Sequence, residues 1–259
     1  MEKPQIHVIK IGGNIIDDPE ALNSFLRDFA SMKGLKILVH GGGKIVTQMA
    51  KDLGIESQMV DGRRVTDAKS LQIVTMVYAG WINKSIVAAL QSKKCKALGL
   101  TGPDGGLIKA EKRNPIPIDF GFVGDITEVN AKDLSQWVHM GYIPVFAPIT
   151  SDEGGQLLNT NADTLAQAIA ISLTTYFDVD LVYCFEKHGV LKDPADENSV
   201  IPMINLAIFE SLKKDGIVSS GMIPKLENAL TAISKGVKVV RLCHADDLHY
   251  ANKGTQIKA

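Results

Sequence analysis

The chain has 259 residues, of which 45% are hydrophobic and 22% charged, the composition of an ordinary globular protein. Its 28 basic and 29 acidic residues nearly cancel, which disfavours nucleic-acid binding as the main role. The N-terminus lacks the apolar core of a signal peptide and no uninterrupted apolar run exceeds five residues, so we expect a cytoplasmic protein with no membrane association.

Apolar periodicity divides the chain into alternating strands and helices. In chain order the pattern predicts a strand at 6–11, a helix at 18–32, a strand at 35–39, helices at 43–53 and 67–92, a strand at 95–100, a helix at 130–140, a strand at 143–149, a helix at 161–173, a strand at 179–185, helices at 205–214 and 222–235, and a strand at 237–242. Hairpins are expected at 56–66 and 107–127, the second beside a short strand pair at 150–158.

This alternation is typical of βα units. We therefore expect an α/β fold with an open, mostly parallel sheet sandwiched between helices and with β-hairpins at one end. A boundary near residue 175 would divide one continuous domain into two lobes, 1–175 and 176–259.

The first two strands both end in glycine-rich turns. The first runs into Lys10 and Gly12–Gly13, and the second into Gly41–Gly43. Glycine lets backbone N–H groups approach an anion closely, and a helix N-terminus adds partial positive charge. Either turn alone is compatible with a plain tight turn, but together they indicate phosphate chemistry. The sequence contains neither a standard P-loop nor a dinucleotide-binding G-x-G-x-x-G.

Three further polar segments lie where loops meet helices or where a hairpin turns. Asn159–Asp163 precedes or begins a helix, where Asn and Asp are common N-caps. Lys225 lies near the start of another helix and could be an ordinary surface lysine. Asp61–Thr66 could be a hairpin turn with solvated charges. Because ligands bind at the carboxyl ends of strands in open sheets, the glycine turns and segment 185–191 are expected to converge on one site.

The cysteines and histidines indicate neither disulfides nor a metal site. Cys95, Cys184 and Cys243 are odd in number and widely spaced, so we expect buried free thiols, which fit a reducing compartment. The six histidines form no H-x-x-x-H or similar ligand pair. No dedicated protein metal site is therefore expected.

Five motifs together resemble the amino acid kinase family over nearly the whole chain. They are Ile9-Lys10-Ile11-Gly12-Gly13, His40-Gly41-Gly42-Gly43, Gly62-Arg63-Arg64-Val65-Thr66, Asn159-Thr160-Asn161-Ala162-Asp163 and Gly221-Met222-Ile223-Pro224-Lys225. The spacing is most similar to the branch that acts on N-acylated glutamate. The resemblance implies transfer of a phosphoryl group from MgATP to the side-chain carboxylate of an N-acyl-L-glutamate, with N-acetyl the expected acyl group, as the second step of arginine biosynthesis.

The resemblance also implies roles for individual residues. The catalytic set would be Lys10, Lys225 and Asp163, with the lysines on opposite sides of the phosphoryl group and Asp163 holding both. The substrate would be bound by Gly42, Gly43, Arg64 and Asn159. The nucleotide would be bordered by Gly12, Gly13, Glu186, Gly189, Val190, Leu191, Ile217, Val218 and Ser219. Lobe 1–175 would then bind the acyl amino acid and lobe 176–259 the nucleotide.

The reaction that the resemblance implies does not require a general base, which agrees with the lack of a catalytic triad in the sequence. A carboxylate with a pKa of about 4.3 is already ionised at neutral pH, so it needs no general base. Catalysis can then consist of positioning and charge stabilisation. Mg²⁺ would be carried by the nucleotide phosphates and water rather than by several protein ligands.

Two alternatives remain. A sister kinase acting on aspartate, carbamate or a nucleoside monophosphate would share Lys10 and the glycines but should lack the pairing of Arg64 with Asn159. A non-catalytic amino-acid sensor would have no need of Lys10, Asp163 and Lys225 together.

The helix at 67–92 bears on assembly. Its apolar residues exceed what one sheet face is expected to bury, which predicts a homodimer built through this helix, although they could also be core: Ile73, Val74, Val77, Trp81 and Ile82. In arginine-inhibited members of the resembled family an extra N-terminal helix links dimers into a ring. Because the first strand begins by about residue 5, we expect that helix to be absent and activity to be insensitive to arginine.

Overall fold

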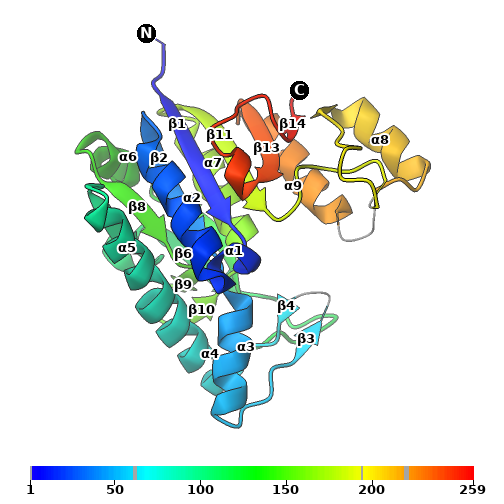
Figure 1. The fold of residues 1–259 in the computed structure, drawn as a ribbon. Helices are drawn as coiled ribbons and strands as arrows, with labels where there is room; N and C mark the ends of the chain where they lie inside the picture. The colour runs from blue at the N-terminus through cyan, green and yellow to red at the C-terminus, as the bar shows by residue number, and fades with distance from the viewer. Residues whose placement is uncertain (1, 61–62, 194, 219–221) are drawn as a thin grey trace.

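The computed structural model describes residues 2–60, 63–193, 195–218 and 222–259. Its centre is an eight-stranded sheet with the order β12-β14-β13-β11-β1-β2-β8-β5 (Figure 1). The strands, in that order, are Met203–Ile204, Thr255–Ile257, Val239–His244, Asp178–Phe185, Gln5–Ile11, Leu35–His40, Ile143–Phe146 and Ala97–Leu100. Neighbours pair in parallel except β13 and β14, which are antiparallel. The predicted mostly parallel sheet is confirmed.

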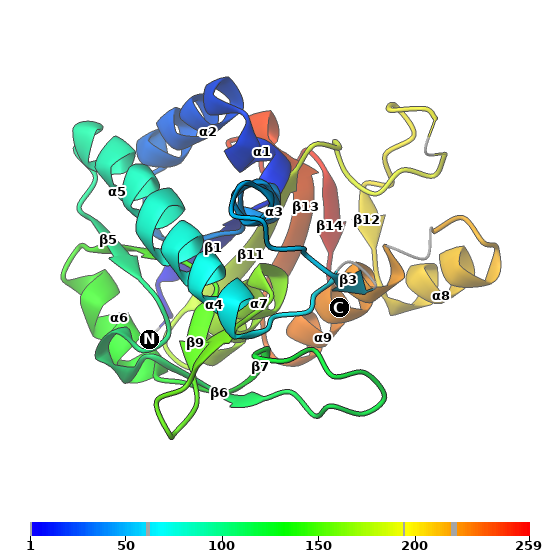
Figure 2. The same cartoon turned by 90° about the horizontal axis from the view of Figure 1, so that it is seen from below.

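Helices cover both faces of this sheet (Figure 2). One face carries α1 (Gly13–Asp17), α2 (Pro19–Ser31), α3 (Gly43–Asp52), α4 (Ala68–Thr75), the π-helical η1 (Met76–Ile82) and α5 (Asn83–Ser92). The other carries α6 (Ala131–His139), α7 (Ala162–Leu173), α8 (Leu206–Lys214) and α9 (Ile223–Ser234). Short 3₁₀ turns lie at η2 (Asp104–Gly106) and η3 (Ala245–Asp247).

Alternation along β1 divides its side chains between two apolar cores. Ile6 and Val8 are fully buried on the α6–α9 side, whereas Ile9 and Ile11 are fully buried on the α1–α5 side. Because side chains two residues apart point to the same face of a strand, Lys10 lies on the α7 side with Ile6 and Val8. The same alternation that builds the core therefore aims Lys10 at α7.

Smaller sheets decorate one end of the central one. The predicted hairpin at 56–66 contains the paired strands β3 (Met59–Val60) and β4 (Arg63–Arg64). The predicted hairpin at 107–127 contains β6 (Ile108–Lys112) and β7 (Gly124–Val129), within a sheet of order β10-β9-β6-β7 that also includes β9 (Ile149–Ser151) and β10 (Leu157–Asn159). Figure 1 shows β3, β4, β9 and β10 beyond the tip of the β1 arrow, near the carboxyl ends of the parallel strands.

The helical segment Ala68–Ser92 is long and apolar enough, by length and composition alone, to cross a membrane. Its apolar side chains nevertheless pack beneath the sheet, and four that were expected to leave surplus surface for a partner are at most 3% exposed: Ile73, Val74, Val77 and Ile82. The expectation of surplus apolar surface is wrong for these four, because they are buried in the α1–α5 core. Of the five apolar residues singled out in the sequence, only Trp81, 69% exposed, faces outward.

Two of the three cysteines face each other across neighbouring strands. Cys184 of β11 is the register partner of Cys243 of β13, and their Sγ atoms lie 4.0 Å apart in the α1–α5 core. Both are free and buried, as predicted. Cys95 is only half-buried, so the prediction is wrong there; it lies in the short connection between α5 and β5 rather than within the strand.

Candidate active site

An ion pair joins the end of β1 to the start of α7. Nζ of Lys10 lies 2.7 Å from Oδ1 of Asp163. Asn161 caps α7, because its side chain accepts hydrogen bonds from the backbone N–H groups of Asp163 and Thr164. The phenol of Tyr183 donates to the carbonyl oxygen of Asp163 at 3.2 Å. The N-cap interpretation of this motif is therefore correct for Asn161, and the cap fixes Asp163 for its contact with Lys10.

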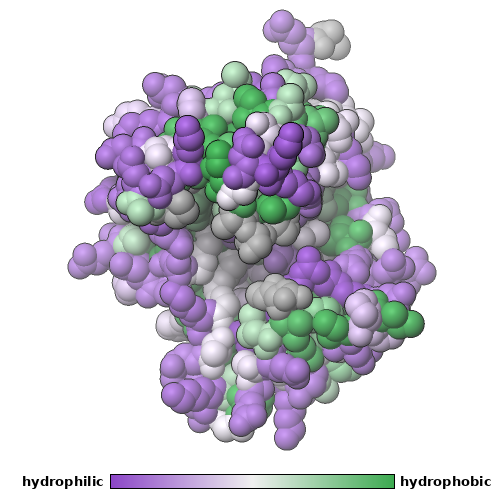
Figure 3. Space-filling view, turned by 90° about the vertical axis from the view of Figure 1, so that its right-hand side faces the viewer, coloured by the Kyte–Doolittle hydropathy of each residue, from purple (hydrophilic) through white to green (hydrophobic). Residues whose placement is uncertain are grey.

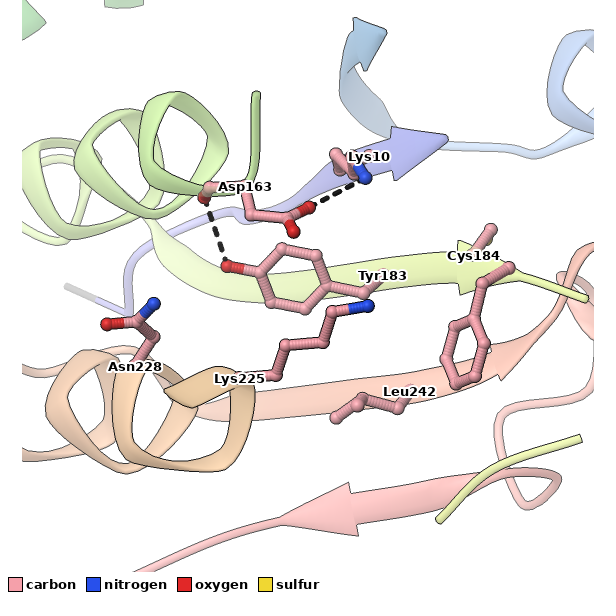
Figure 4. A pocket seen from close by; sticks show the side chains of 8 residues that line it. Lys10, Asp163, Tyr183, Cys184, Lys225, Asn228 and Leu242 are labelled. Carbon is pink, nitrogen blue, oxygen red and sulfur yellow. Dashed lines mark hydrogen bonds and ion pairs between the residues drawn. The ribbon is translucent and has the colours of Figure 1, made fainter. Parts of the chain in front are cut away.

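A second lysine reaches the same space from α9. Lys225 lies in the first turn of α9 and extends along β11, with its ammonium 5.7 Å from the centre of the Phe185 ring (Figure 4). Lys10, Asp163 and Lys225 line one narrow cavity of about 30 Å³. The structure thus brings together the three residues that the sequence assigned to catalysis, from three elements far apart in the chain.

The carboxylate of Asp163 and the ammonium groups of Lys10 and Lys225 stabilise one another in this cavity. Burial would raise the pKa of Asp163, but the Lys10 ammonium, its hydrogen bond and the more distant Lys225 together hold this pKa below its ordinary value. The carboxylate is therefore ionised at neutral pH, and it stabilises two ammonium groups that would otherwise repel each other. Two cations set around one anion leave net positive charge for a phosphoryl group.

A larger cavity of about 220 Å³ is lined by the second glycine turn and by Asn161. Gly42 adopts φ +137°, and a Cβ there would lie 2.2 Å from Cδ1 of Ile82, so only glycine fits. The π-helical turn that contains Ile82 also brings the side chain of Tyr78 to the cavity wall. Gly43 begins α3, which directs helix N–H groups towards this region.

His40, which precedes the glycine turn, has a structural role. Nδ2 of Asn83 donates to its Nε2 at 3.1 Å, and its Nδ1 donates to the carbonyl oxygen of Gly41 at 2.9 Å. Burial lowers the pKa of His40 to about 4, so the ring is neutral at physiological pH. It fixes the turn and does not supply a catalytic charge.

Arg64 lies in the wall of this larger cavity and is only 8% exposed. Its guanidinium donates to Oγ of Ser57 at 2.5 Å, to the carbonyl oxygen of Gly43 at 3.0 Å and to Oγ1 of Thr47 at 2.8 Å. All three acceptors are neutral, and no carboxylate in the described part of the chain forms an ion pair with Arg64. Its charge is therefore available to an anionic ligand, with two of its five N–H donors outside these contacts.

Asn159 faces the same cavity from the end of β10. Its Nδ2 donates to Oγ1 of Thr66 at 3.0 Å, which ties β10 to the chain just after Arg64. All four residues assigned to substrate binding, Gly42, Gly43, Arg64 and Asn159, thus line one cavity. Asp61 and Gly62 of the same predicted turn lie outside the described residues.

The residues assigned to the nucleotide are less tightly grouped. The backbone N–H of Gly12 donates to the carbonyl oxygen of Cys184 at 3.3 Å, and Gly13 begins α1 and lines the larger cavity. Glu186 directly follows β11. Burial would raise the pKa of Glu186, but a hydrogen bond from Asn14 and nearby lysines hold it below the ordinary value.

Beyond Glu186 the chain packs against the C-terminal strand. A Cβ on Gly189 would lie 2.8 Å from Oγ1 of Thr255, which itself accepts from the N–H of Val190. Val190 and Val218 are 3% and 6% exposed and belong to the core, with Ile217 packed against it. Leu191 forms an isolated bridge to Val200. Ser219 lies outside the described residues.

Figure 3 shows the surface hollowed between its upper part, where α8 lies, and its lower part, where the β3–β4 hairpin lies. Several residues that line the two cavities were not predicted from the sequence: Tyr78, Arg113 and Val123 in the larger one, and Tyr183 and Asn228 in the narrow one. Phe185 of the predicted segment 185–191 also lines the narrow cavity. Alternation along β11 could have identified Tyr183, because it shares a face with Leu181 of the α6–α9 core.

Comparisons with known proteins agree with this geometry. Residues 5–244 match the model of the amino acid kinase family. The chain is similar to the acetylglutamate kinase of Cytophaga hutchinsonii, with 55% identity over 246 residues that cover 94% of this chain and 93% of that protein. It is also similar to the acetylglutamate kinase of Parabacteroides distasonis, with 51% identity over 257 residues that cover 99% and 100% of the two chains.

The fold also resembles a solved structure, the N-acetylglutamate synthase of Neisseria gonorrhoeae in complex with coenzyme A and N-acetylglutamate. The TM-score is 0.84 with 22% identity, and the match covers 100% of this chain and 60% of that one. At this identity the likeness concerns the fold alone.

Proposed function

Because the chain belongs to the amino acid kinase family, in its acetylglutamate kinase branch, we propose that it transfers the γ-phosphoryl group of ATP to the γ-carboxylate of N-acetyl-L-glutamate. The products are an acyl phosphate and ADP, and the reaction is the second step of arginine biosynthesis. The observation that carries this proposal is the arrangement of Lys10, Asp163 and Lys225 beside a cavity that holds Arg64 without an acidic partner among the described side chains.

The larger cavity binds the acceptor. Arg64 and Asn159 hold its α-carboxylate, Arg64 through its positive charge and the two N–H donors outside its contacts with Ser57, Gly43 and Thr47. The backbone of Gly42 and Gly43 directs the γ-carboxylate towards Lys10. A carboxylate with an ordinary pKa of about 4.3 is ionised at neutral pH, so the protein needs no base to activate it.

The narrow cavity stabilises the phosphoryl group during transfer. Lys10 and Lys225 approach it from two sides and neutralise the charge that spreads over its oxygens in the transition state. Asp163 is a positioning residue, because it contacts Lys10 and lies near Lys225. Gly12 and Gly13 let the backbone approach the phosphates closely.

The nucleotide lies along residues 176–259, and residues 1–175 form the acceptor lobe. Support comes from the two cavities: every residue that lines the larger one precedes residue 163, whereas Lys225 and Phe185 of the narrow one belong to the later part. Glu186, Gly189, Val190, Leu191, Ile217, Val218 and Ser219 border the nucleotide, through main-chain atoms where the side chains are core.

ATP is used as its Mg²⁺ complex, and the ion supplies positive charge on the phosphates. Among the described residues no three His, Cys, Asp or Glu side chains converge on a metal site. The fit is therefore to an ion held mainly by nucleotide phosphates and water. Asp163 interacts electrostatically with both lysines and Glu186 with Lys225, and Asp163 forms an ion pair with Lys10.

The chain works as a cytoplasmic homodimer. Trp81 and Met76 are 69% and 58% exposed on the outer side of the long helix, and they offer a patch that a two-fold partner would cover. The free thiols Cys184 and Cys243 fit a reducing compartment.

A coupled ADP-release assay with MgATP tests the activity. The panel contains N-acetyl-L-glutamate, L-glutamate, L-aspartate, carbamate and uridine monophosphate. We expect turnover with N-acetyl-L-glutamate and little with the others. Faster turnover of aspartate, carbamate or the nucleotide would assign a sister kinase, and binding of N-acetyl-L-glutamate without ADP release would assign a sensor.

A further inference from the structure

Besides Arg63 and Arg64, a third arginine reaches the acceptor cavity from the β6–β7 hairpin. Arg113 directly follows β6, and its backbone N–H donates to the carbonyl oxygen of Val123 at 2.8 Å. Val123 in turn bridges to Asn159. Arg113, Val123 and Asn159 all line the cavity of about 220 Å³, so the hairpin places Arg113 beside a residue assigned to the substrate.

One edge of the Arg113 guanidinium is held rigidly. Its Nε lies 3.1 Å from both carboxylate oxygens of Asp125, and its Nη2 lies 2.5 Å from Oδ1. The ring of Phe120 lies 5.6 Å from its Cζ. A guanidinium fixed along its Nε–Nη2 edge presents Nη1 in a defined direction.

Nη1 of Arg113 is buried and has no hydrogen-bond partner within the described chain. Buried polar atoms without partners are rare in folded proteins, and each needs an explanation. Arg113 lines the acceptor cavity, so an oxygen atom of a ligand bound there would supply the missing partner.

The remaining groups of the cavity indicate which oxygen this is. Arg64, without an acidic partner among the described residues, is assigned to the α-carboxylate, and the γ-carboxylate faces Lys10. Asp125 largely neutralises Arg113, so Nη1 suits an oxygen that neither of those groups claims. In an N-acylated glutamate that oxygen belongs to the acyl group.

We propose that Arg113 binds an oxygen of the substrate's N-acyl group through Nη1 and thereby selects acylated over free glutamate. Asp125 is the positioning residue that orients it. This inference rests on the proposed function, because it assumes an N-acyl-glutamate in the cavity.

The test measures the KM values of two variants, and their inhibition by L-glutamate. Arg113→Met removes the donor, and Lys112→Met is the matched control, since Lys112 is the exposed neighbour on β6 and does not line the cavity. We expect Arg113→Met to raise the KM for N-acetyl-L-glutamate about 10- to 100-fold, the loss of one buried charge-assisted hydrogen bond, with the KM for MgATP unchanged. The inhibition constant of L-glutamate, which lacks the acyl group, should stay within about twofold. Lys112→Met should match the wild type throughout.

Further substrates separate Arg113 from Arg64. N-Acetyl-γ-aminobutyrate lacks the α-carboxylate, so its binding should depend on Arg113 and not on Arg64. N-Succinyl-L-glutamate carries a second carboxylate on the acyl group; a larger loss with it than with the N-acetyl substrate assigns Nη1 to that carboxylate, and an equal loss assigns it to the amide carbonyl.

Equal losses for N-acetyl-L-glutamate and L-glutamate, or no loss for either, would overturn the assignment and leave Arg113 as a support of the hairpin. Failure of the proposed function has a different signature, because wild-type protein would then not turn over N-acetyl-L-glutamate. In that case calorimetric binding of N-acetyl-L-glutamate to wild type and Arg113→Met still decides the inference.

Discussion

Replacing Lys10 by Met separates the catalytic from the structural role of the Lys10–Asp163 pair. The substitution keeps the length of the side chain and removes its charge. The two partners lie 2.7 Å apart, with side chains 15% and 26% exposed, so the pair is largely but not fully withdrawn from water. Loss of one transition-state contact should lower kcat by about 10²- to 10³-fold, or about 2.7–4 kcal/mol.

The same substitution leaves Asp163 with only the more distant Lys225. We expect a loss of about 1–2 kcal/mol in the free energy of unfolding, because the carboxylate keeps partial solvent contact. For a chain of this size that corresponds to a fall in Tm of about 2–8 °C. The double variant Lys10→Met/Asp163→Asn removes both charges and should recover most of the Tm, while kcat stays low.

Coupled ADP release and thermal unfolding monitored by circular dichroism measure the two effects on the same samples. A double variant that regains turnover together with stability would show that the pair only supports the fold. Near-normal kcat in Lys10→Met alone would remove Lys10 from the mechanism.

Three other changes test separate parts of the site. Arg64→Lys should raise the KM for N-acetyl-L-glutamate at least about 10-fold with the KM for MgATP unchanged, because one ammonium cannot both keep the contacts of the guanidinium with Ser57, Gly43 and Thr47 and bind the substrate. Equal losses in steady-state kinetics would indicate that Arg64 supports the fold instead. The pKa of Asp163 is lowered by folding, so its stabilisation is present above its ordinary value of 3.8 and is lost as the pH falls through the lower folded value. Urea midpoints of wild type and Lys10→Met should therefore converge as the pH falls below 3.8, and a constant gap would contradict the ion pair. Trp81→Glu should convert a dimer to monomers in light scattering, and an unchanged mass would move the interface elsewhere.

Local sequence patterns predicted the large elements, because apolar periodicity reports directly which faces are buried. The strands at 6–11 and 179–185 and the helix at 161–173 lie within a residue or so of β1, β11 and α7. The strands β12 and β14 were not predicted, because strands of two or three residues are too short to show an alternating pattern of apolar and polar residues. They form because β13 offers an edge that only the folded chain creates.

The site residues also fall into two groups, those that a local sequence pattern identifies and those that it does not. Lys10 and Asp163 carry local signals, a strand end and a helix cap, and their contact follows from alternation along β1. Arg113 and Tyr78 carry none. Arg113 lies in the predicted hairpin, but it reaches the cavity only because Val123 of that hairpin also bridges to Asn159. Tyr78 reaches the cavity only because a π-helical turn lies between α4 and α5. Neither a bridge between segments far apart in the chain nor a π turn can be read from periodicity.

The position of β1 in the sheet has a consequence for folding during synthesis. β1 is the first strand made, yet one of its two neighbours, β11, begins its pairing at Asp178, which lies 173 residues beyond its register partner Gln5. At a translation rate of 5–20 residues per second, that partner emerges roughly 9 to 35 s later. During this interval one edge of an apolar strand has no native partner, and Lys10 lacks the strand that will flank it. The nascent chain is therefore expected to be most prone to aggregation, and to depend most on chaperones, until β11 has left the ribosome.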